Sequence, residues 1–295
     1  MNAPDRLDLR FMSRALELAA RGLWTTDPNP RVGCVIAVGE RVIAEGWHER
    51  AGGPHAEAAA LSIAGGAARG ATAYVTLEPC CHHGRTPPCA DALIAAGIRR
   101  VSYAIRDPNP RVSGGGAARL AAAGIEVTSG LLEAEARALN RGFLSRMERE
   151  RPWLRVTLSA DGDLQPLRAR SSALMTGVGT VLALDPRLDV ELPQATRQPL
   201  RVVLDTRLRT PPAARILAPP GESLVLTASA DRARIAVLEA AGARVLPVAA
   251  GAQGLDLWAV MKLLAGLGIN ELQVEGGPTL VAALTRAGLV DELLA

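Results

Sequence analysis

Short apolar runs rich in β-branched residues alternate with helical segments along most of this chain, and this alternation constrains its fold more than any other feature. Residues 72–77 form such a run, and residues 100–105 and 125–128 repeat it, with helical patterns between them at 89–96 and 117–123. Consecutive strands separated by a helix pair in parallel, with the helices on the faces of the sheet. The sequence therefore predicts an α/β protein built around a largely parallel sheet.

The chain opens with an amphipathic helix and a hairpin. Apolar residues recur at helical spacing over 6–22, and a Pro-Asn-Pro turn then leads to two apolar runs at 32–38 and 42–47. Further helical patterns cover 55–64 and 133–149. These elements complete the first half of the chain.

A charged segment that ends in proline, residues 148–152, is the best candidate for a linker between two domains. The chain has 295 residues, which is the length of two ordinary domains. After the linker, strands are predicted at 154–158, 173–176, 201–204, 223–226, 244–247 and 271–274, and helices at 231–241, 256–266 and 278–287. We therefore predict domains over residues 1–150 and 151–295, with a proline-rich and largely looped stretch at 185–222.

The charge balance argues against several classes of function. The 33 basic and 30 acidic residues give a formal net charge of +3, and neither sign forms a long block. This pattern disfavours a nucleic-acid-binding arm or a membrane-binding patch. The chain has no run of about 18 apolar residues, and residues 1–10 lack the apolar segment of a signal peptide. We therefore expect a cytoplasmic protein.

Cysteine usage points to metal or catalytic chemistry. Three of the four cysteines, Cys80, Cys81 and Cys89, lie close together in the sequence. In a cytosolic protein such crowding favours a metal site or a catalytic site over disulfides. Cys34 stands apart and is expected to be a small core residue on a strand.

The strongest chemical motif is His55-Ala56-Glu57 at a predicted helix start, followed by Pro79-Cys80 after the next strand and by Cys89 at the next helix. One imidazole and two thiolates can bind zinc and leave its fourth position to water. Glu57 would then transfer protons without binding the metal, as in the zinc nucleobase deaminases. The general deaminase signature has two residues between the cysteines, whereas eight separate them here.

Three neighbouring residues compete with these ligands. His82 is separated from Cys80 by one residue, a spacing that makes joint tetrahedral ligation awkward. We therefore expect neither His82 nor His83 to bind the metal. Cys81 is expected to be part of a pocket wall.

The segment 80–89, with the sequence CCHHGRTPPC, resembles the deaminase half of the bifunctional riboflavin-biosynthesis enzymes, the RibD/RibG family. Other stretches within residues 7–148 agree with the same family: DPNPRVGC at 27–34, GWH at 46–48, GGPHAE at 52–57, VTLEPC at 75–80 and DPNP at 107–110. The resemblance implies a cytidine-deaminase-like domain with three α/β/α layers.

The resemblance also implies a reaction and a set of residues. The family deaminase converts the 2-amino group of a diamino-hydroxy-phosphoribosylamino-pyrimidine to a carbonyl group. On matching positions the zinc ligands are His55, Cys80 and Cys89, and the proton shuttle is Glu57. The positions that match contacts to the pyrimidine or the ribose phosphate are Asn29, His48, His82, Arg85, Asp107 and Asn109.

Residues 171–294 resemble the reductase half of the family, which has a dihydrofolate-reductase-like α/β fold and uses NADPH to reduce the ribosyl side chain to ribityl. The matching stretches are TGVGTVL at 176–182, QPLRVVLD at 198–205 and EGGPTL at 275–280. Glycines before a helix N-terminus let the backbone approach a phosphate closely. The resemblance implies that Glu275 contacts the substrate and that the cofactor-binding region includes Thr180, Gly276, Gly277, Pro278, Thr279 and Leu280.

The second half departs from the family pattern at several positions. A segment that the family carries between Gly162 and Leu167 is absent, and Thr157 stands in place of a lysine. Leu184 replaces an aspartate and Glu191 replaces an arginine, and an acid in place of a base is hard to reconcile with an anionic ligand. The sequence ends at residue 295, where the family continues for several strands, and this leaves a sheet edge without a partner. We therefore expect an abbreviated reductase domain.

Two other interpretations remain open. In one, the zinc deaminase is fused to a non-catalytic domain that acts as a scaffold or an oligomer contact. In the other, the chain is an RNA-editing nucleobase deaminase, but a net charge of +3 and 3% aromatic residues do not supply the basic, aromatic surface that RNA binding needs. The family resemblance implies instead a small-molecule substrate, Zn²⁺ and NADPH as cofactors, no nucleic-acid or membrane partner, and a homo-oligomer.

Overall fold

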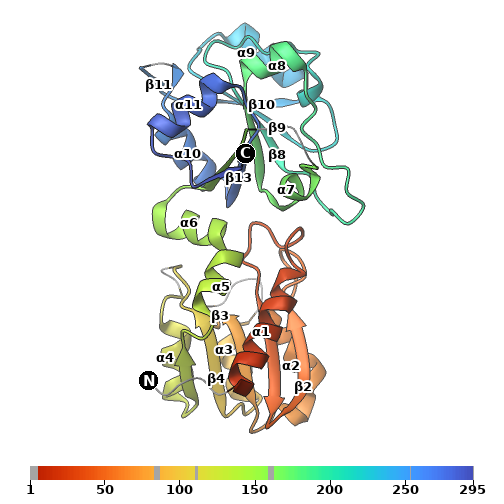
Figure 1. Cartoon of the computed structure of the whole chain (residues 1–295), viewed down its shortest axis with the longest axis vertical. Helices are drawn as coiled ribbons and strands as arrows, with labels where there is room; N and C mark the ends of the chain where they lie inside the picture. The colour runs from red at the N-terminus through yellow and green to blue at the C-terminus, as the bar shows by residue number, and fades with distance from the viewer. Residues whose placement is uncertain (1–5, 83–86, 110–111, 159–162, 253, 295) are drawn as a thin grey trace. The chain divides into compact units, whose positions relative to one another are not determined.

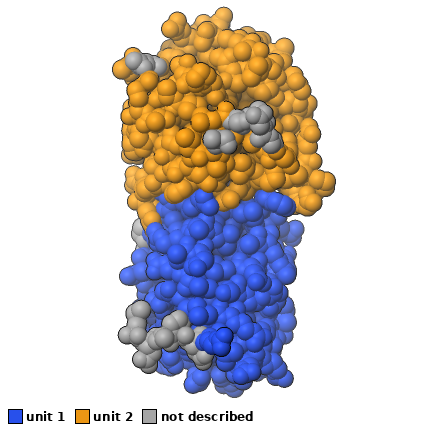
Figure 2. Space-filling view, viewed as in Figure 1, with its two compact units in different colours: residues 1–147 blue, residues 148–295 orange. Residues whose placement is uncertain are grey.

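The computed structural model describes residues 6–82, 87–109, 112–158, 163–252 and 254–294. The chain divides into two compact units, residues 1–147 and residues 148–295 (Figure 2). The second unit begins at residue 148, the first residue of the charged segment 148–152 in which the sequence places a linker. Each unit has its own sheet and its own core.

Unit 1 contains a five-stranded sheet with the order β2-β1-β3-β4-β5 (Figure 1). Its strands are β1 (Gly33–Val38), β2 (Arg41–Trp47), β3 (Thr72–Leu77), β4 (Arg100–Ile105) and β5 (Glu126–Ser129). The predicted hairpin is confirmed, because β1 and β2 pair in antiparallel fashion. β1 is also antiparallel to β3, so the parallel part of this sheet is limited to β3, β4 and β5.

Helices cover both faces of this sheet. They are α1 (Arg6–Ala20), α2 (Ala56–Ala64), the 3₁₀ turn η1 (Gly65–Ala68), α3 (Cys89–Ala95), α4 (Gly115–Ala122), α5 (Glu133–Leu139) and α6 (Arg141–Arg149). Successive side chains of a strand point to opposite faces. Cys34 and Ile36 of β1 therefore join the core under α2, α3 and α4, whereas Val35 and Ala37 join the core under α1, α5 and α6. The unit has the three α/β/α layers predicted from the sequence.

One predicted helix is two helices in the structure. The sequence pattern favours a continuous helix over 133–149, but α5 ends at Leu139 and α6 begins at Arg141. The side chain of the buried Asn140 pairs with the backbone of Arg31: Oδ1 accepts from the amide at 2.8 Å, and Nδ2 donates to the carbonyl at 2.9 Å. This contact with a distant segment holds Asn140 at the break, so periodicity within the helix could not reveal it.

Unit 2 contains a seven-stranded sheet with the order β10-β9-β8-β7-β13-β6-β14. Its strands are β6 (Trp153–Thr157), β7 (Ala173–Gly177), β8 (Leu200–Leu204), β9 (Ser223–Thr227), β10 (Ala243–Pro247), β13 (Glu271–Val274) and β14 (Glu292–Leu294). Every neighbouring pair in this sheet is parallel. A separate antiparallel pair joins β11 (Ala250–Gly251) and β12 (Gly254–Leu255).

Apolar cores lie on the two faces of the second sheet. The helices are α7 (Gln165–Arg170), α8 (Val178–Leu184), the 3₁₀ turn η2 (Arg215–Leu217), α9 (Arg232–Ala240), α10 (Leu257–Gly266) and α11 (Pro278–Arg286). Val260 and Leu264 of α10 and Leu284 of α11 pack on one face. Val181 of α8 and Leu238 of α9 pack on the other face, over β8, β9 and β10.

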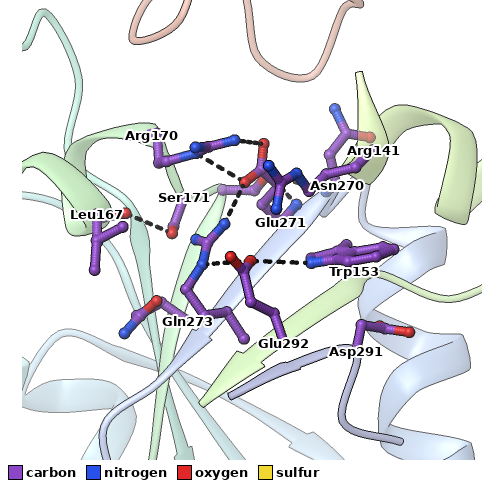
Figure 3. Close-up of polar contacts among 12 residues, drawn as sticks. Arg141, Trp153, Leu167, Arg170, Ser171, Asn270, Glu271, Gln273, Asp291 and Glu292 are labelled. Carbon is purple, nitrogen blue, oxygen red and sulfur yellow. Dashed lines mark hydrogen bonds and ion pairs between the residues drawn. The ribbon is translucent and has the colours of Figure 1, made fainter. Parts of the chain in front are cut away.

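The second face is apolar over β8, β9 and β10 but carries charged side chains at β13 and β6, among them Glu271, which Figure 3 draws with polar partners. Leu154 and Leu272 point into the apolar core, so the alternate residues Arg155 and Glu271 point to the opposite face. Arg155 Nη2 donates to Glu271 Oε2 at 3.3 Å, and Arg170 Nε of α7 donates to the same oxygen at 3.0 Å. Arg155 Nε also donates to Glu292 Oε2 at 2.9 Å. We call these four residues the ionic cluster of unit 2.

The six strands predicted for the second half are all present, but six elements were not predicted: α7, α8, η2, β11, β12 and β14. All six are short, and β14 spans only Glu292–Leu294, so the sequence offers no periodicity to detect. Among the described residues, no helix combines the length and the apolar character needed to cross a bilayer.

Candidate functional site

The three candidate metal ligands converge in unit 1 from separate elements. His55 is the N-cap residue of α2, Cys80 follows the carboxyl end of β3, and Cys89 is the first residue of α3. His55 Nδ1 lies 3.6 Å from Cys80 Sγ and 3.3 Å from Cys89 Sγ, and the three ligand atoms lie within 4.8 Å of one another. In the part of the chain that the structure describes, no other group of three such side chains comes together in this way.

The donor set fits zinc. One imidazole nitrogen and two cysteine sulfurs are a common set of protein ligands for a catalytic zinc ion. A hydrogen bond with the Cys89 thiol, ahead of one with His55, lowers the pKa of Cys80 to about 4. The amide of Cys89 also donates to Cys80 Sγ at 3.3 Å. Cys80 is therefore a thiolate at neutral pH, the form in which cysteine binds metal.

Glu57 occupies a fixed, buried position beside these ligands. It lies in the first turn of α2 and is 3% exposed. Burial, ahead of the negative charge on Cys80, raises the pKa of Glu57 to about 7. The helix packs closely on β2 at Gly46, where a Cβ atom would lie 2.5 Å from the Ala56 oxygen. A side chain at position 46 would therefore displace the helix that carries Glu57.

A cavity of about 270 Å³ lies next to the metal ligands. Pockets lined by apolar groups and a few placed polar groups are typical sites for small molecules. The wall contains His55, Glu57 and Cys80, and it also contains five of the predicted substrate contacts: Asn29, His48, His82, Asp107 and Asn109. The sixth, Arg85, lies outside the described residues.

His48 fixes the orientation of Asn29 in the cavity wall. His48 Nδ1 donates to the Pro54 carbonyl at 2.8 Å, because a carbonyl oxygen can only accept. Burial lowers the pKa of His48, so the ring is neutral at pH 7. Its Nε2 therefore accepts from Asn29 Nδ2 at 3.0 Å. The Asn29 amide is held in one orientation at the cavity.

The opposite part of the wall is also polar. Asp107 Oδ1 accepts from the Asn109 amide at 2.8 Å, which shapes the turn after β4. Burial, with the charges of Glu78 and Cys80, raises the pKa of Asp107 to about 6. His82 Nδ1 is buried and has no hydrogen-bond partner among the described residues, so a ligand in the cavity could supply one.

Two charged residues of this wall were not singled out by the sequence. Arg146 reaches the cavity from α6, and its Nη2 donates to the Pro28 carbonyl at 3.4 Å. No local motif marks Arg146, since only the packing of α6 brings it to the site. Glu78 was visible only as one letter of VTLEPC, although it is 3% exposed and also lies in the wall.

Unit 2 contains a larger cavity, of about 670 Å³. It lies at the carboxyl ends of β7 and β8 and at the start of α11, where parallel α/β sheets commonly bind ligands. Its wall includes five of the predicted cofactor-binding residues: Thr180, Gly277, Pro278, Thr279 and Leu280. Gly276 is not part of this wall, and a Cβ atom there would lie 3.0 Å from Leu280 Cδ2.

This wall fits a nicotinamide dinucleotide. Cβ atoms added at Gly177 or Gly277 would meet nothing closer than 3.8 Å, so these residues leave space along the backbone for a ligand. The N-terminus of α11 opens beside them, and helix N-termini favour phosphate groups. Arg209 supplies a cation and is the one charged residue among the described residues of the wall. Backbone amides, a helix N-terminus and an arginine together suit a pyrophosphate and a further phosphate.

Glu275, the predicted substrate contact, forms an ion pair that the sequence did not reveal. Arg168 of α7 donates to its carboxylate through Nε at 2.7 Å and through Nη2 at 2.6 Å.

The structure also shows the surroundings of the residues that depart from the family pattern. Thr157 accepts a hydrogen bond from Gln273, and Leu184 is 74% exposed and lies in the cofactor cavity wall. The Glu191 amide donates to Gln165 Oε1 at 2.8 Å.

Comparison with family models divides the chain in the same way. Residues 5–105 match the model of the cytidine and deoxycytidylate deaminase zinc-binding region. Residues 141–295 match the model of the RibD C-terminal domain.

Comparison with individual proteins covers nearly the whole chain. It is 47% identical to the riboflavin biosynthesis protein RibD of Escherichia coli K12, over 97% of this chain and 86% of that protein. A solved structure of RibD from Acinetobacter baumannii superposes with a TM-score of 0.89 at 40% identity, over 98% of this chain and 85% of that one. A diaminohydroxyphosphoribosylaminopyrimidine deaminase/5-amino-6-(5-phosphoribosylamino)uracil reductase from Thermotoga maritima superposes with a TM-score of 0.84 at 33% identity, over 97% of this chain and 85% of that one.

Proposed function

Because this chain belongs to the RibD family of riboflavin biosynthesis proteins, we propose that unit 1 hydrolytically deaminates 2,5-diamino-6-(5-phosphoribosylamino)pyrimidin-4(3H)-one. The family joins a deaminase and a reductase of riboflavin biosynthesis, and this chain carries both domains. The observation that carries the proposal is the convergence of His55, Cys80 and Cys89 on a cavity that also contains a buried, unligated Glu57.

The residues of unit 1 can divide the chemistry among them. His55, Cys80 and Cys89 would hold zinc, which when bound acts as a Lewis acid and activates water toward a ring carbon. Glu57 then takes a proton from the attacking water and gives a proton to the departing ammonia. One water is consumed and one ammonia is released, so the amino group is replaced by a carbonyl group.

The remaining polar residues of the wall would bind the substrate. Asn29, Asp107 and Asn109 offer hydrogen-bonding groups suited to a heterocycle and a ribose, and His82 has an unused ring nitrogen. The substrate also carries a phosphate, which needs a cation. Arg146 is a cation in the described wall, and Arg85 is the one that the family resemblance implies.

In unit 2 we propose the NADPH-dependent reduction of the ribosyl side chain to ribityl. Thr180 and residues 277–280, which line the cavity, would hold NADPH, which supplies a hydride when bound. The Glu275 carboxylate and the Arg168 guanidinium, which form an ion pair, would contact the substrate. This proposal is supported by the size of the cavity, its glycine-rich wall and the helix N-terminus that opens on it.

Mass spectrometry of the pyrimidine substrate after incubation with zinc-loaded protein tests both reactions. We expect conversion of one amino group to a carbonyl without NADPH, and a further gain of two hydrogens with NADPH. Deamination alone would favour the alternative in which unit 2 is a non-catalytic scaffold. No conversion under either condition would refute the proposed function.

The role of Glu57 can be tested separately from zinc binding. Glu57→Gln should keep one zinc per chain but lose deamination, because the amide cannot accept and return a proton. Glu49→Gln is a matched control, since Glu49 is exposed and is not part of the cavity wall. Full activity of Glu57→Gln would refute the assignment.

We further propose that the protein is a cytoplasmic homo-oligomer that does not bind nucleic acid. Its four cysteines are all free, as is usual in a reducing compartment, and its net charge is only +3. Light scattering of the purified protein, cell fractionation and an RNA-binding assay test the three parts.

A further inference from the structure

Glu78 is a buried carboxylate that the proposed chemistry does not use. It follows β3 directly and lies two residues before the candidate ligand Cys80. Its Oε2 accepts from the Asp107 amide at 3.3 Å and from the Gly114 amide at 2.9 Å. Its Oε1 accepts from the Ala117 amide at 3.1 Å. One side chain therefore binds three backbone amides of a segment distant in sequence.

These amides bracket the loop that carries two proposed substrate contacts. Asp107 and Gly114 stand at the two ends of the loop, and one carboxylate oxygen of Glu78 binds both amides. Asn109 lies between them and is held by the Asp107 side chain. Glu78 therefore joins the two ends of this segment, in addition to the hydrogen bond from Arg106 Nη2 to the Ser113 carbonyl at 3.2 Å and those from the Val112 and Ser113 amides to the Asn109 carbonyl.

The third amide belongs to the first turn of α4. Gly114 is the N-cap residue of this helix and has no side chain, so the N-cap residue cannot cap the first turn with a side-chain hydrogen bond. Glu78 binds the Ala117 amide in the place of a capping residue, and its negative charge lies at the positive end of the helix dipole.

The start of α4 is also pressed against the backbone that leads to the metal ligand. A Cβ atom at Gly116 would lie 1.8 Å from the Pro79 carbonyl oxygen, and one at Gly115 would lie 2.7 Å from Cys81 Sγ. Residues 78–81 therefore pack directly against the start of α4, with no space for a side chain at position 115 or 116.

We propose that Glu78 is a positioning residue of the deaminase site. It holds the loop from Asp107 to Gly114 so that Asp107 and Asn109 face the substrate on one side of the cavity, while Cys80 faces the metal on the other. The kinetic consequence rests on the proposed deaminase function, whereas the tethering of the loop does not.

The substitution Glu78→Gln tests this role. The variant keeps the size of the side chain, but its amide nitrogen cannot accept from a backbone amide, so at least one of the three contacts is lost. We expect KM for the pyrimidine to rise about tenfold, kcat to stay within about threefold, and zinc to remain at one per chain. If Glu78→Gln does not fold, Glu78→Asp serves instead, because its shorter side chain cannot reach all three amides.

A double-mutant cycle separates positioning from a general loss of stability. Asn109→Ala should raise KM by itself, and adding Glu78→Gln should then raise it little further, because the loop no longer carries that contact. An equal fold-increase in both backgrounds, or an unchanged KM in Glu78→Gln alone, would overturn the inference.

Hydrogen exchange supplies a readout that does not depend on turnover. The Gly114 and Ala117 amides should exchange at least about tenfold faster in Glu78→Gln, while the Val75 amide in β3 keeps its rate. Unchanged exchange at both positions would refute the tethering. If the unmodified protein does not deaminate the pyrimidine, the proposed function fails, and hydrogen exchange still decides whether Glu78 holds the loop.

Discussion

Replacing Glu271 by glutamine should destabilise unit 2 far more than the same change at Glu292, although both carboxylates bind Arg155. The Glu271 side chain is 1% exposed and pairs with Arg155 and with Arg170, and Figure 3 shows its contact with Arg170. The Glu292 side chain is 28% exposed. Glu271→Gln keeps the shape of the side chain and removes the charge that compensates two arginines. The Arg155 side chain is itself 1% exposed, so water cannot solvate its charge.

Removing one member of a buried ion pair lowers the free energy of unfolding by about 3–5 kcal/mol, because a buried charge loses a compensating partner. A partly exposed pair contributes about 1 kcal/mol or less. With an unfolding entropy of about 2.1 cal/mol/K per residue over the length of unit 2, the Glu271 change should lower the melting temperature by about 10–15 °C. The Glu292 change should lower it by about 3 °C or less.

Differential scanning calorimetry of the full chain measures this difference. The transition of unit 2 can be identified by its upward shift when NADPH is added, because a ligand stabilises the unit that binds it. Equal shifts for the two variants would refute the reasoning, since burial would then not control the effect. A shift below about 3 °C for Glu271→Gln would do the same.

Three further outcomes are expected. Removing zinc with a chelator should abolish deamination but spare the NADPH-dependent reduction of supplied deaminated pyrimidine, as measured by mass spectrometry; loss of both activities would contradict separate sites. Arg209→Gln should raise KM for NADPH at least about tenfold with little change in kcat, because a charge-assisted contact to phosphate is lost; unchanged KM would place the phosphate elsewhere. Asp8→Asn should lower the free energy of unfolding by about 1–2 kcal/mol at pH 7, because hydrogen bonds from Arg100, ahead of that from Tyr74, lower the pKa of Asp8. The folded-state pKa lies below the usual 3.8, so the difference from the unmodified protein should be full above about pH 5 and shrink as the pH falls through 3.8 and below; urea unfolding at several pH values checks this, and a constant difference would contradict it.

The strands were predictable because each is a short apolar run that the sheet buries. Residues 72–77 and 271–274 carry their signal within themselves, and the structure places strands at those positions. The break at Asn140 was not predictable, because its cause is the backbone of Arg31, which is distant in sequence. Local patterns therefore located most elements but not the contacts that end or divide them.

The same distinction explains what was visible of the candidate site in unit 1. The metal-ligand group was predictable because each ligand lies at the end of a helix or strand: His55 before α2, Cys80 after β3 and Cys89 at the start of α3. Their residue types and spacing form a known motif. Arg146 and the amides bound by Glu78 come from segments with no motif of their own. Their place at the cavity follows from packing, which one sequence does not display.

In unit 2 the sequence argument was weakest where it judged positions one at a time. Thr157 in place of a lysine suggests the loss of a positive charge near the substrate, and Glu191 in place of an arginine suggests a second loss. The structure shows that this side of the sheet still carries Arg155, Arg168 and Arg170, each in an ion pair with a glutamate. A charged ligand meets the sum of these nearby groups rather than any single position, and that sum cannot be read from a motif. The two substitutions therefore cannot be judged from their own positions alone, because the sum includes three arginines and also the three glutamates, Glu271, Glu275 and Glu292, that balance their charge.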